Sequence, residues 1–469
     1  MSTERTYIEK LFAVRNIPLA SNRQQLFEAF VKEEAIMQAA KQILENQQLL
    51  MDTWQFKNRL ADIQQQSVSI PNATVGKVYE AKLDFIKLNW KDFIFSDIAG
   101  LEAYGLTYDN EKESIQGTPV KSGDIKVTLQ FRLAGEAPDA ALHEKIIPLV
   151  INPNPKSLWK NIDSDKNAPF WKEDNVAVAG VLGEKQIVVA SKRGRSHANV
   201  GSFRDDDFAF KHFDDSGWSV LAVSDGAGSA RLSREGARIA CTGIVEYFEQ
   251  NFTAAVRENF DTLVGEHAAG AGADTQKKLA HFVYENLGKA ALSVHKKLED
   301  FATKLEVPVK DFHATLIFAL LKKYPFGYAI LTFGVGDCPI GLLNKDLTEI
   351  TLMNWLDVGE FGGGTRFITM PEIFKSDKFA TRFGFRLVPD FAYLMLMTDG
   401  IYDPKFVVEA NLEKITAWQE LLADLGGKND DQVTVELNSG KPEVAAQLSA
   451  WMDFWSPGNH DDRTLMIVS

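Results

Sequence analysis

The hydrophobic pattern along the chain changes its period at about residue 67, and the stretch before that point has a helical period. Between residues 21 and 66 there is no proline or glycine, and Phe30, Met37, Leu44 and Met51 recur every seven residues. This pattern predicts one long helix or a helical pair within a helical N-terminal region, residues 1–67. Two interpretations remain open: a coiled-coil docking arm, or a helix packed on its own neighbour. The second is favoured because the stripe lacks a clean second heptad position.

From residue 68 the chain changes to short alternating stretches separated by turns. Residues 124–131 alternate polar and apolar side chains, and residues 70–79 and 105–119 contain similar short runs. The pattern predicts a small antiparallel β-sandwich over residues 68–150. Its Pro-Asn-Ala-Thr-Val-Gly opening, and its Gly-Thr-Pro turn followed by Gly-Asp-Ile-Lys-Val, resemble immunoglobulin-like modules of bacterial multidomain proteins. The resemblance covers about residues 68–133 and includes no catalytic constellation, so we expect this part to position or recruit.

Residues 151–175 have the composition of a linker. Asn152-Pro153-Asn154-Pro155 opens this stretch, and these residue types predict no regular element within it. Trp159 and Trp171 leave two alternatives: the linker packs on a surface, or both are ordinary half-buried aromatic residues.

The remainder, residues 176–469, reads as one large domain. Strands are predicted over residues 186–190, 218–224, 315–321 and 328–333, and helices from 229 past Phe248 and over about 275–305. Strands with hairpin-length joins, alternating with long helices, favour an α+β fold over a doubly wound parallel sheet.

Composition and charge exclude several classes of binding partner and indicate a cellular compartment. The chain has 469 residues and a formal net charge of −13, which argues against a nucleic-acid footprint and against an anionic membrane surface. We therefore expect a protein or small-molecule partner. Cys241 and Cys338 form neither a disulfide framework nor a zinc-like cluster. With no apolar run of about 18 residues and no apolar leader, the sequence predicts a cytoplasmic protein.

Acidic residues stand where three apolar strands end or begin. The run 220–223 leads to Asp225-Gly226, the run 393–397 leads to Asp399-Gly400, and Asp461 precedes the run 464–468. A buried strand that breaks at glycine presents its last side chains to a ligand. These carboxylates could converge as an oxygen-ligand site for Mg²⁺ or Mn²⁺.

Six motifs in one order make the large domain recognisable. They are Ser-Asp-Gly-Ala-Gly at 224–228, His-Ala-Thr-Leu at 313–316, Gly-Val-Gly-Asp at 334–337, Met-Thr-Asp-Gly at 397–400, His-Asp-Asp-Arg-Thr at 460–464, and before them residues 195–208. This order resembles that of metal-dependent protein phosphatases of the phosphatase 2C family. The segment 195–208 is similar to the His-containing opening of its bacterial subfamily. Single motifs of this kind are weak, but six in order over residues 190–469 are a strong signal.

The resemblance implies a central antiparallel β-sandwich flanked by helices, with two Mn²⁺ or Mg²⁺ ions at its edge. It implies that Asp225 bridges both ions, that the Gly226 carbonyl holds the second, and that Asp399 and Asp461 complete the first. Carboxylates and a carbonyl suit these ions better than zinc. Two such ions acidify water and neutralise a phosphate ester without a covalent phosphoenzyme.

Further acidic positions carry subsidiary roles in the same resemblance. Asp206 orients the attacking water, with Asp205 and Asp207 as alternatives one place away, and Asp311 stands where bacterial members hold a third, weaker ion. Asp337 in its glycine turn either belongs to the site or serves only the backbone. Thr315 is expected to be structural.

The sequence departs from the family pattern at two positions. Ala227 stands where many relatives have a histidine proposed as general acid, and Gly201 stands where many have a phosphate-binding arginine. His197, Arg193 or Arg195 would supply the missing donor or charge. A buried structural role for His197 remains equally open.

A glycine-rich stretch at residues 362–366 occupies the place of the family's variable flap, and we interpret it as a substrate-facing loop. Arg366 within it and Arg382 after it are candidates for phosphate contact. The alternative for both is a solvated surface arginine.

These observations predict a bacterial-type phosphatase that uses activated water to hydrolyse phosphoserine or phosphothreonine monoesters in a phosphoprotein substrate. The N-terminal parts would recruit that substrate or a cognate serine/threonine kinase. A catalytically silent module that binds phosphoprotein or partner proteins is the alternative, and small phosphomonoesters are a third possibility.

Overall fold

The structure is a computed structural model that describes residues 2–270, 272–357, 364–456 and 458–469. The chain divides into two compact units, Met1–Leu158 and Trp159–Ser469. Among the described helices, none combines the length and the apolar character that a bilayer crossing requires.

The first unit begins with helices, as the heptad spacing predicts. α1 (Thr3–Val14), α2 (Gln24–Phe30) and α3 (Glu34–Gln65) share a small apolar core at the N-terminal end of α3, and η1 (Ser21–Arg23) precedes α2. Residues 21–66 are therefore a helical pair, and α3 does pack on its own neighbours there. Farther along α3, Leu50 and Trp54 are 70% and 65% exposed. A docking role for that part of α3 stays a prediction.

Two sheets follow in the first unit. One has the strand order β1-β7-β6-β3, with β1 (Ala73–Thr74), β3 (Phe93–Ala99), β6 (Gly123–Leu133) and β7 (His143–Asn152). The other, β2-β5-β4, contains β2 (Tyr79–Lys82), β4 (Leu106–Asp109) and β5 (Ser114–Gly117), with η2 (Glu102–Tyr104) before β4. Side chains of both sheets and of α3 form one core. The immunoglobulin-like assignment of this sandwich stays a prediction.

One short helix lies where the sequence predicts no regular element. α4 (Pro155–Leu158) forms one turn, and Asn154 Oδ1 accepts a hydrogen bond from the Lys156 N–H at 2.9 Å. Proline is tolerated at the first position of a helix because that residue's N–H has no intrahelical partner. The prolines and asparagines of this stretch therefore begin a helix here, and the prediction is wrong at this point.

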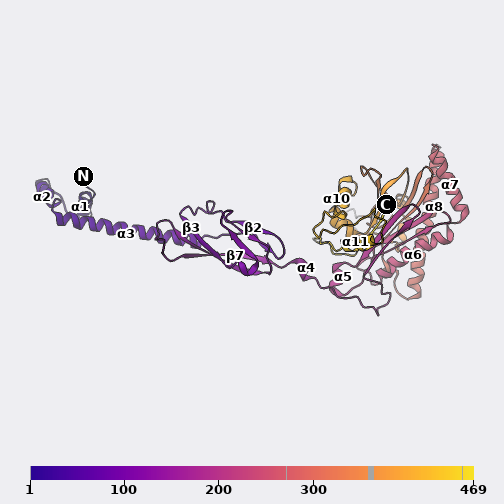
Figure 1. Cartoon of the computed structure of the whole chain (residues 1–469), viewed down its shortest axis with the longest axis horizontal. Helices are drawn as coiled ribbons and strands as arrows, with labels where there is room; N and C mark the ends of the chain where they lie inside the picture. The colour runs from indigo at the N-terminus through magenta and orange to yellow at the C-terminus, as the bar shows by residue number, and fades with distance from the viewer. Residues whose placement is uncertain (1, 271, 358–363, 457) are drawn as a thin grey trace. The chain divides into compact units, whose positions relative to one another are not determined.

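The second unit contains two antiparallel sheets, with helices such as α6, α8 and α10 around its strands (Figure 1). The five-stranded sheet has the order β10-β11-β12-β13-β16, and its strands are β10 (Asp207–Phe213), β11 (Trp218–Ser224), β12 (Leu316–Tyr324), β13 (Gly327–Val335) and β16 (Phe383–Val388). The six-stranded sheet has the order β15-β14-β17-β18-β9-β8, and its strands are β8 (Asn175–Leu182), β9 (Lys185–Lys192), β14 (Ile340–Asn344), β15 (Ile350–Leu352), β17 (Phe391–Met397) and β18 (Arg463–Val468).

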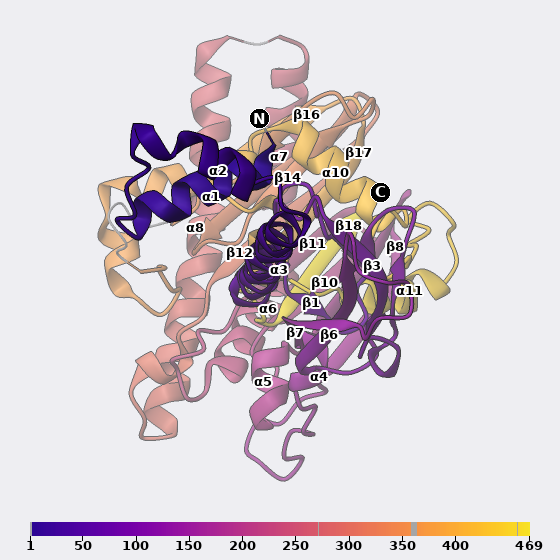
Figure 2. The same cartoon turned by 90° about the vertical axis from the view of Figure 1, so that its left-hand side faces the viewer.

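Helices cover the outer face of each sheet. α6 (Ser233–Asn251), α7 (Ala254–Ala268) and α8 (Ala273–Lys304) pack on the five-stranded sheet, and α7 and α8 lie side by side (Figure 2). α9 (Asp399–Phe406), α10 (Ile415–Leu425) and α11 (Glu443–Trp451) pack on the six-stranded sheet. The shorter elements are α5 (Arg195–Val200), η3 (Val309–Phe312), η4 (Pro371–Lys375), η5 (Asp377–Arg382) and η6 (Glu409–Asn411). The predicted α+β fold, a β-sandwich flanked by helices, is confirmed.

The continuous apolar runs of the central strands follow from burial on both faces. In β11, Trp218 and Val220 contact the helices, whereas Leu221 contacts the opposite sheet. A strand with one solvated face would alternate polar and apolar residues instead. The sandwich is therefore a four-layer structure with a core on each side of each sheet.

The register brings the ends of several strands to one edge of the sandwich. The end of β11 pairs with the start of β12, which pairs with the end of β13. In the other sheet, Met397 at the end of β17 pairs with Leu465 near the start of β18. Residues just beyond these strand ends are therefore collected from distant parts of the chain.

A glycine in β14 tests the packing of α10 on the six-stranded sheet. A Cβ added at Gly341 would lie 2.2 Å from a ring carbon of the buried Trp418. We expect Gly341→Ala to destabilise the protein by about 1–3 kcal/mol or more through overpacking. Thermal denaturation followed by circular dichroism measures this. Gly265→Ala in α7, where a Cβ meets nothing within 4 Å, is the control and should be neutral or stabilising; equal behaviour of the two variants would contradict the packing described.

Candidate metal centre

Asp225 stands at the end of β11 in a turn that a partner strand holds. Its N–H donates to Thr315 Oγ1 at 2.9 Å, and its carbonyl accepts from the Thr315 N–H at 2.8 Å. The next residue, Gly226, forms an antiparallel bridge with Ala314. A Cβ on Gly226 would lie 2.7 Å from the Asp205 carbonyl oxygen. Glycine is required at position 226 because the segment that contains Asp205 packs directly against this turn. Thr315 holds the turn through its hydrogen bonds, which is the structural role predicted for it.

Asp206 is buried beside the second acidic strand end. Its Oδ2 accepts hydrogen bonds from Thr398 Oγ1 at 2.8 Å and from Thr464 Oγ1 at 2.7 Å. The Thr464 N–H donates to Thr398 Oγ1 at 2.9 Å, so the two threonines also hold each other. Asp206 is thereby fixed to the strand ends that carry Asp399 and Asp461.

Two buried carboxylate oxygens have no hydrogen-bond donor in the described part of the chain. These are Oδ1 of Asp399 and Oδ1 of Asp337. The other oxygen of Asp337 accepts from Thr365 Oγ1 at 2.7 Å. Buried polar atoms in folded proteins almost always have a partner, so oxygens left in this way are suited to a bound cation.

The carboxyl groups raise one another's pKa values. Burial, and then the negative charges of Asp399 and Asp206, raise the pKa of Asp225 well above its usual range. Burial raises the pKa of Asp399 in the same way, together with the charges of Asp461 and Asp337. Burial and the charge of Asp462 raise the pKa of Asp206 to about 8, although its two threonine bonds act in the opposite direction.

This donor set fits a divalent cation that prefers oxygen. A positive charge among the carboxylates would relieve the repulsion that raises their pKa values. Cys338 lies within 4.8 Å of ligand atoms of Asp225 and Asp337, but burial raises the pKa of its thiol well above the usual value. A protonated thiol is a poor ligand, and oxygen ligands favour Mg²⁺ or Mn²⁺.

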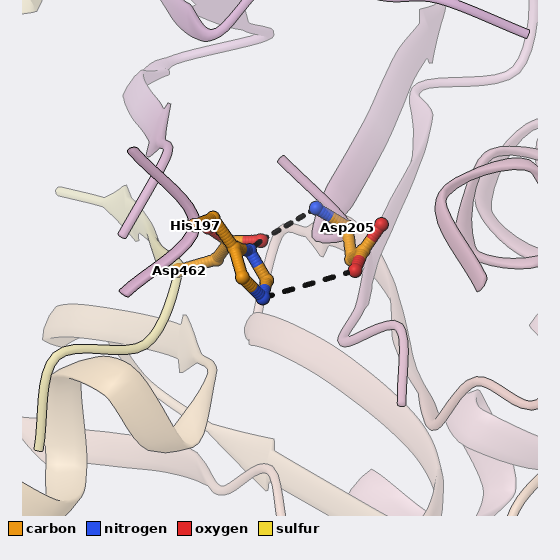
Figure 3. Close-up of side chains that lie close together, drawn as sticks. All are labelled: His197, Asp205 and Asp462. Carbon is orange, nitrogen blue, oxygen red and sulfur yellow. Dashed lines mark hydrogen bonds and ion pairs between the residues drawn. The ribbon is translucent and has the colours of Figure 1, made fainter. Parts of the chain in front are cut away.

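A second acidic cluster ties the opening segment to the C-terminal strand. Asp462 Oδ1 accepts from the Gly194 N–H at 2.5 Å, and its Oδ2 accepts from the Asp205 N–H at 2.5 Å. The Nδ1 atom of His197 lies 3.0 Å from both oxygens, and His197 Nε2 lies 4.0 Å from Asp205 Oδ2. Figure 3 shows the imidazole between the two carboxylates.

His197 and Asp462 form an ion pair, with 3.0 Å between Nδ1 and Oδ1, and each raises or lowers the pKa of the other in the direction that favours its charged form. Burial alone would lower the pKa of His197, but Asp462 and then Asp205 and Asp461 raise it to about 9. Burial would raise the pKa of Asp462, but the bonds from His197, Gly194 and Asp205 hold it below the usual value. The two ring nitrogens of His197 thus face Asp462 and Asp205, and its role as a donor to phosphate or as a structural residue stays a prediction.

Comparison with protein families identifies the large domain. The family model described as Protein phosphatase 2C matches residues 193–452, which is more than half of the chain. The chain belongs to the phosphatase 2C family. The resemblance stated from the six motifs is therefore confirmed. A search by sequence among curated proteins finds no match.

A search of solved structures finds bacterial phosphatases that are similar to this chain at low sequence identity. A bacterial serine phosphatase is 11% identical with a TM-score of 0.36, and the alignment covers 60% of this chain and 96% of that one. Serine/threonine phosphatase Stp1 from Staphylococcus aureus is 12% identical, with a TM-score of 0.34 and coverage of 64% and 98%. The catalytic domain of serine threonine protein phosphatase PstP, in complex with two manganese ions, is 13% identical, with a TM-score of 0.36 and coverage of 63% and 99%. The family assignment rests on the family model and the motifs.

Arg193 and Arg195, at the start of the segment 193–208, donate hydrogen bonds to backbone carbonyls outside the candidate metal centre. Arg193 donates to the carbonyls of Ser202 and Ile162 at 2.8 and 2.9 Å and pairs with Asp174 at 3.3 Å. Arg195 donates to the Asp453 carbonyl at 2.6 Å. In the described structure, neither arginine contacts Asp225, Asp399 or Asp461. A role in phosphate binding for either stays a prediction.

Gly201 has a conformational reason to differ from the family's arginine. It ends α5 with a φ of +71°, and a Cβ there would lie 3.0 Å from the Ile162 side chain. A left-handed residue in contact with the linker favours glycine. A residue with a side chain would be strained at this position by the positive φ and by the contact with Ile162.

For three further candidates, the described structure gives no hydrogen bond between the side chain and the aspartates of the candidate metal centre. Asp311 in η3 pairs with Arg231 at 3.1 Å, and its role for a third ion stays a prediction. Arg382 is only 4% exposed and forms a bidentate pair with Asp357 at 2.5 and 2.8 Å. Its interpretation as a solvated arginine is wrong, because Asp357 neutralises it inside the fold. Arg366 is exposed, and the neighbouring residues 362 and 363 of the predicted loop lie outside the described residues.

Two basic side chains that the sequence did not indicate as part of the site, Lys172 and Arg204, hold the segment with Asp206 and Asp207 in place. Lys172 Nζ donates to the Asp206 carbonyl at 2.6 Å and pairs with Asp207 at 2.9 Å. The buried Arg204 also donates to the Asp206 carbonyl, at 2.6 Å. Lys172 thus engages the Asp207 side chain, whereas the Asp206 side chain faces Thr398 and Thr464. The sequence contains one indication of the bonds to Asp206: Thr398 and Thr464 each stand close to an acidic residue at the end of an apolar strand.

Neutralising one aspartate should separate metal binding from stability. With EDTA present at pH 8, we expect Asp399→Asn to raise the melting temperature by a few degrees, because it removes one of the repelling charges. The same variant should lose at least about tenfold in Mn²⁺ affinity by titration calorimetry. Asp346→Asn, at an exposed position, should change neither quantity. A lower melting temperature without metal would contradict the repulsion described.

Removing His197 should destabilise the protein in a pH-dependent manner. Because the folded-state pKa of His197 is about 9 and its ordinary value is 6.5, the pair contributes fully below about pH 6.5 and its contribution is lost as the pH rises through 9. We expect His197→Ala to cost about 3–5 kcal/mol at pH 6. Chemical denaturation at pH 6 and 9.5 measures the difference. His281→Ala on the surface of α8 is the control, and a cost independent of pH would contradict the ion pair.

Proposed function

We propose that this member of the phosphatase 2C family is a metal-dependent phosphoprotein phosphatase that hydrolyses phosphoserine and phosphothreonine monoesters. The observation that carries the proposal is the set of aspartates at one edge of the sandwich, with raised pKa values and with donor-free oxygens on Asp399 and Asp337. A fold that gathers repelling carboxylates loses stability unless a cation binds among them.

This geometry and the family membership support a specific ligand set. Asp225 and the Gly226 carbonyl would hold two ions together, with Asp399 and Asp461 completing one of them. Divalent cations bound there would neutralise the charge of a phosphate ester and acidify the attacking water. Mn²⁺ and Mg²⁺ are the ions that the oxygen ligands favour.

Asp206 would position the attacking water. Thr398 and Thr464 fix its Oδ2 atom, which leaves Oδ1 as the acceptor for a water proton. Fixed hydrogen bonds of this kind keep the acceptor in place throughout the reaction. Asp462 supports this arrangement because it accepts a hydrogen bond from the Asp205 N–H and directly precedes β18. It thereby connects the residue before Asp206 to the strand that carries Thr464.

The first unit would deliver the substrate. Its sandwich and the exposed residues of α3, such as Leu50 and Trp54, suit recruitment of a phosphoprotein or of a cognate serine/threonine kinase. The cytoplasm is the compartment we propose, since Cys241 and Cys338 are both free and buried.

A silent binding module is the second candidate. Ala227 at the position of the relatives' histidine and Gly201 at that of their arginine favour it, because both remove groups suited to phosphate handling. The two candidates differ in turnover and share the metal centre.

Phosphate release decides between them. We expect wild-type protein with Mn²⁺ or Mg²⁺ to hydrolyse p-nitrophenyl phosphate and a phosphothreonine peptide, and EDTA to abolish both activities. Asp225→Asn should lower kcat by at least about a hundredfold, because it removes the bridging carboxylate. A folded wild-type protein that binds Mn²⁺ without turnover of either substrate would establish the silent module instead. Asp346→Asn serves as the matched control.

A further inference from the structure

One imidazole stands opposite the position at which the histidine of other members is missing. Gly226 and Ala314 form an antiparallel bridge, and the Ala227 N–H donates to the His313 carbonyl at 3.0 Å. His313 is therefore the cross-strand partner of Ala227. Opposed side chains in such a pair have Cβ atoms about 4.5–5.5 Å apart. The methyl group of Ala227 leaves room for the imidazole on that face.

The same pairing places His313 on the face of the catalytic aspartate. Side chains alternate along paired strands, so Asp225 and Ala227 project to one side, and Thr315 and His313 project to the same side from the partner strand. The bond from the Asp225 N–H to Thr315 Oγ1 agrees with this arrangement. His313 thus borders the candidate metal centre from the segment between η3 and β12, which pairs with the turn at Asp225.

A neighbouring segment fixes the ring. His313 Nδ1 lies 2.6 Å from Thr369 Oγ1, and the Phe367 ring stacks on the imidazole at 4.9 Å between centroids. The same segment reaches the metal centre at Thr365, which donates to Asp337. Segment Thr365–Thr369 therefore orients both the imidazole and one carboxylate of the cluster.

The contact with Thr369 determines which ring nitrogen carries the proton. The Thr369 hydroxyl is buried, and His313 Nδ1 is its hydrogen-bond partner among the described residues. A hydroxyl that accepted from Nδ1 would leave its own proton buried and unpaired, so it donates to Nδ1. In the neutral ring the proton is then on Nε2, and this atom has no partner in the described structure.

We propose that His313 contacts the substrate and that its Nε2–H donates a hydrogen bond to the ester oxygen of the phosphorylated side chain. The inference rests on the proposed function. In the reaction a water oxygen forms the new bond to phosphorus, and the bond from phosphorus to the ester oxygen breaks with its electron pair moving to that oxygen. One water proton ends on the released alcohol and the other on phosphate. His313 stays neutral and stabilises the charge that develops on the ester oxygen.

The other histidines near the aspartates are differently placed. His197 is held between Asp462 and Asp205. His460 lies between the rings of Trp159 and Trp455 at 4.6 and 4.8 Å. His313 is half-buried, with one nitrogen fixed and the other available as a donor.

The test compares leaving groups that differ in their need for a donor. p-Nitrophenolate departs as a stable anion, whereas the alkoxide of threonine does not. We expect His313→Phe, which keeps a ring for stacking, to lower kcat on a phosphothreonine peptide on the order of a hundredfold and to change kcat on p-nitrophenyl phosphate less than threefold. His313→Gln, which keeps an N–H donor, should retain a larger part of the peptide activity. His281→Phe on α8 should alter neither.

A paired substitution uses the cross-strand geometry directly. In a His313→Ala background, Ala227→His returns an imidazole to the same face from the opposite strand, and we expect it to restore part of the activity on the peptide. Equal losses on both substrates, an unchanged peptide kcat in His313→Phe, or a failure of Ala227→His to restore activity would overturn the inference. Wild-type protein without turnover would overturn the proposed function, and this inference with it.

Two measurements apart from turnover complete the test. Mn²⁺ affinity by titration calorimetry should be the same in His313→Phe and wild type, because His313 is not a ligand in this proposal; a tenfold loss would overturn it. Nitrogen-15 NMR of the histidine rings should report the Nε2–H form of His313, and Thr369→Val should reduce its population. An Nδ1–H form in the wild-type protein would also overturn the inference.

Discussion

The repulsion among buried carboxylates at one edge of the sandwich is the interaction on which the rest of the large domain depends. Asp225, Asp337 and Asp399 are held by backbone bonds, strand ends and helix starts that fix their positions before any cation binds. The energy that holds them comes from the four-layer core, in which every central strand is buried on both faces. The fold thereby maintains a site that is unfavourable alone and favourable with a divalent ion.

The ion pair between His197 and Asp462 is attractive, in contrast to the repulsion among the neighbouring carboxylates. It joins the opening segment to the start of β18 and carries opposite charges where the neighbouring cluster carries like ones. Asp206, between the two clusters, is fixed by threonines from both β17–α9 and β18. Residues 194–206 are therefore joined by hydrogen bonds to the start of β18, although the two segments are far apart in the sequence.

The strand ends and the core aspartates could be predicted from the sequence because their signals are local. An apolar run that stops at Asp-Gly identifies Asp225 and Asp399 without knowledge of their neighbours. The partners of these residues depend on strand order. The bond from Thr398 to Asp206 and the pair of His197 with Asp462 join positions that only the folded sheet brings together. The burial of Arg382 depends in the same way on Asp357. Local composition misleads at α4, where Pro155 begins a turn of helix.

The strand register described above has a consequence for the order of folding. The aspartates of the metal centre come from residues 206, 225, 337, 399 and 461, and their convergence needs β11, β13, β17 and β18 to be in place together. Contacts of such long sequence separation form late, because the entropy of closing large loops must be offset first. A partly folded chain thus has no complete set of ligands. A complete set of oxygen ligands for a divalent cation is therefore formed only when all of these strands are in place.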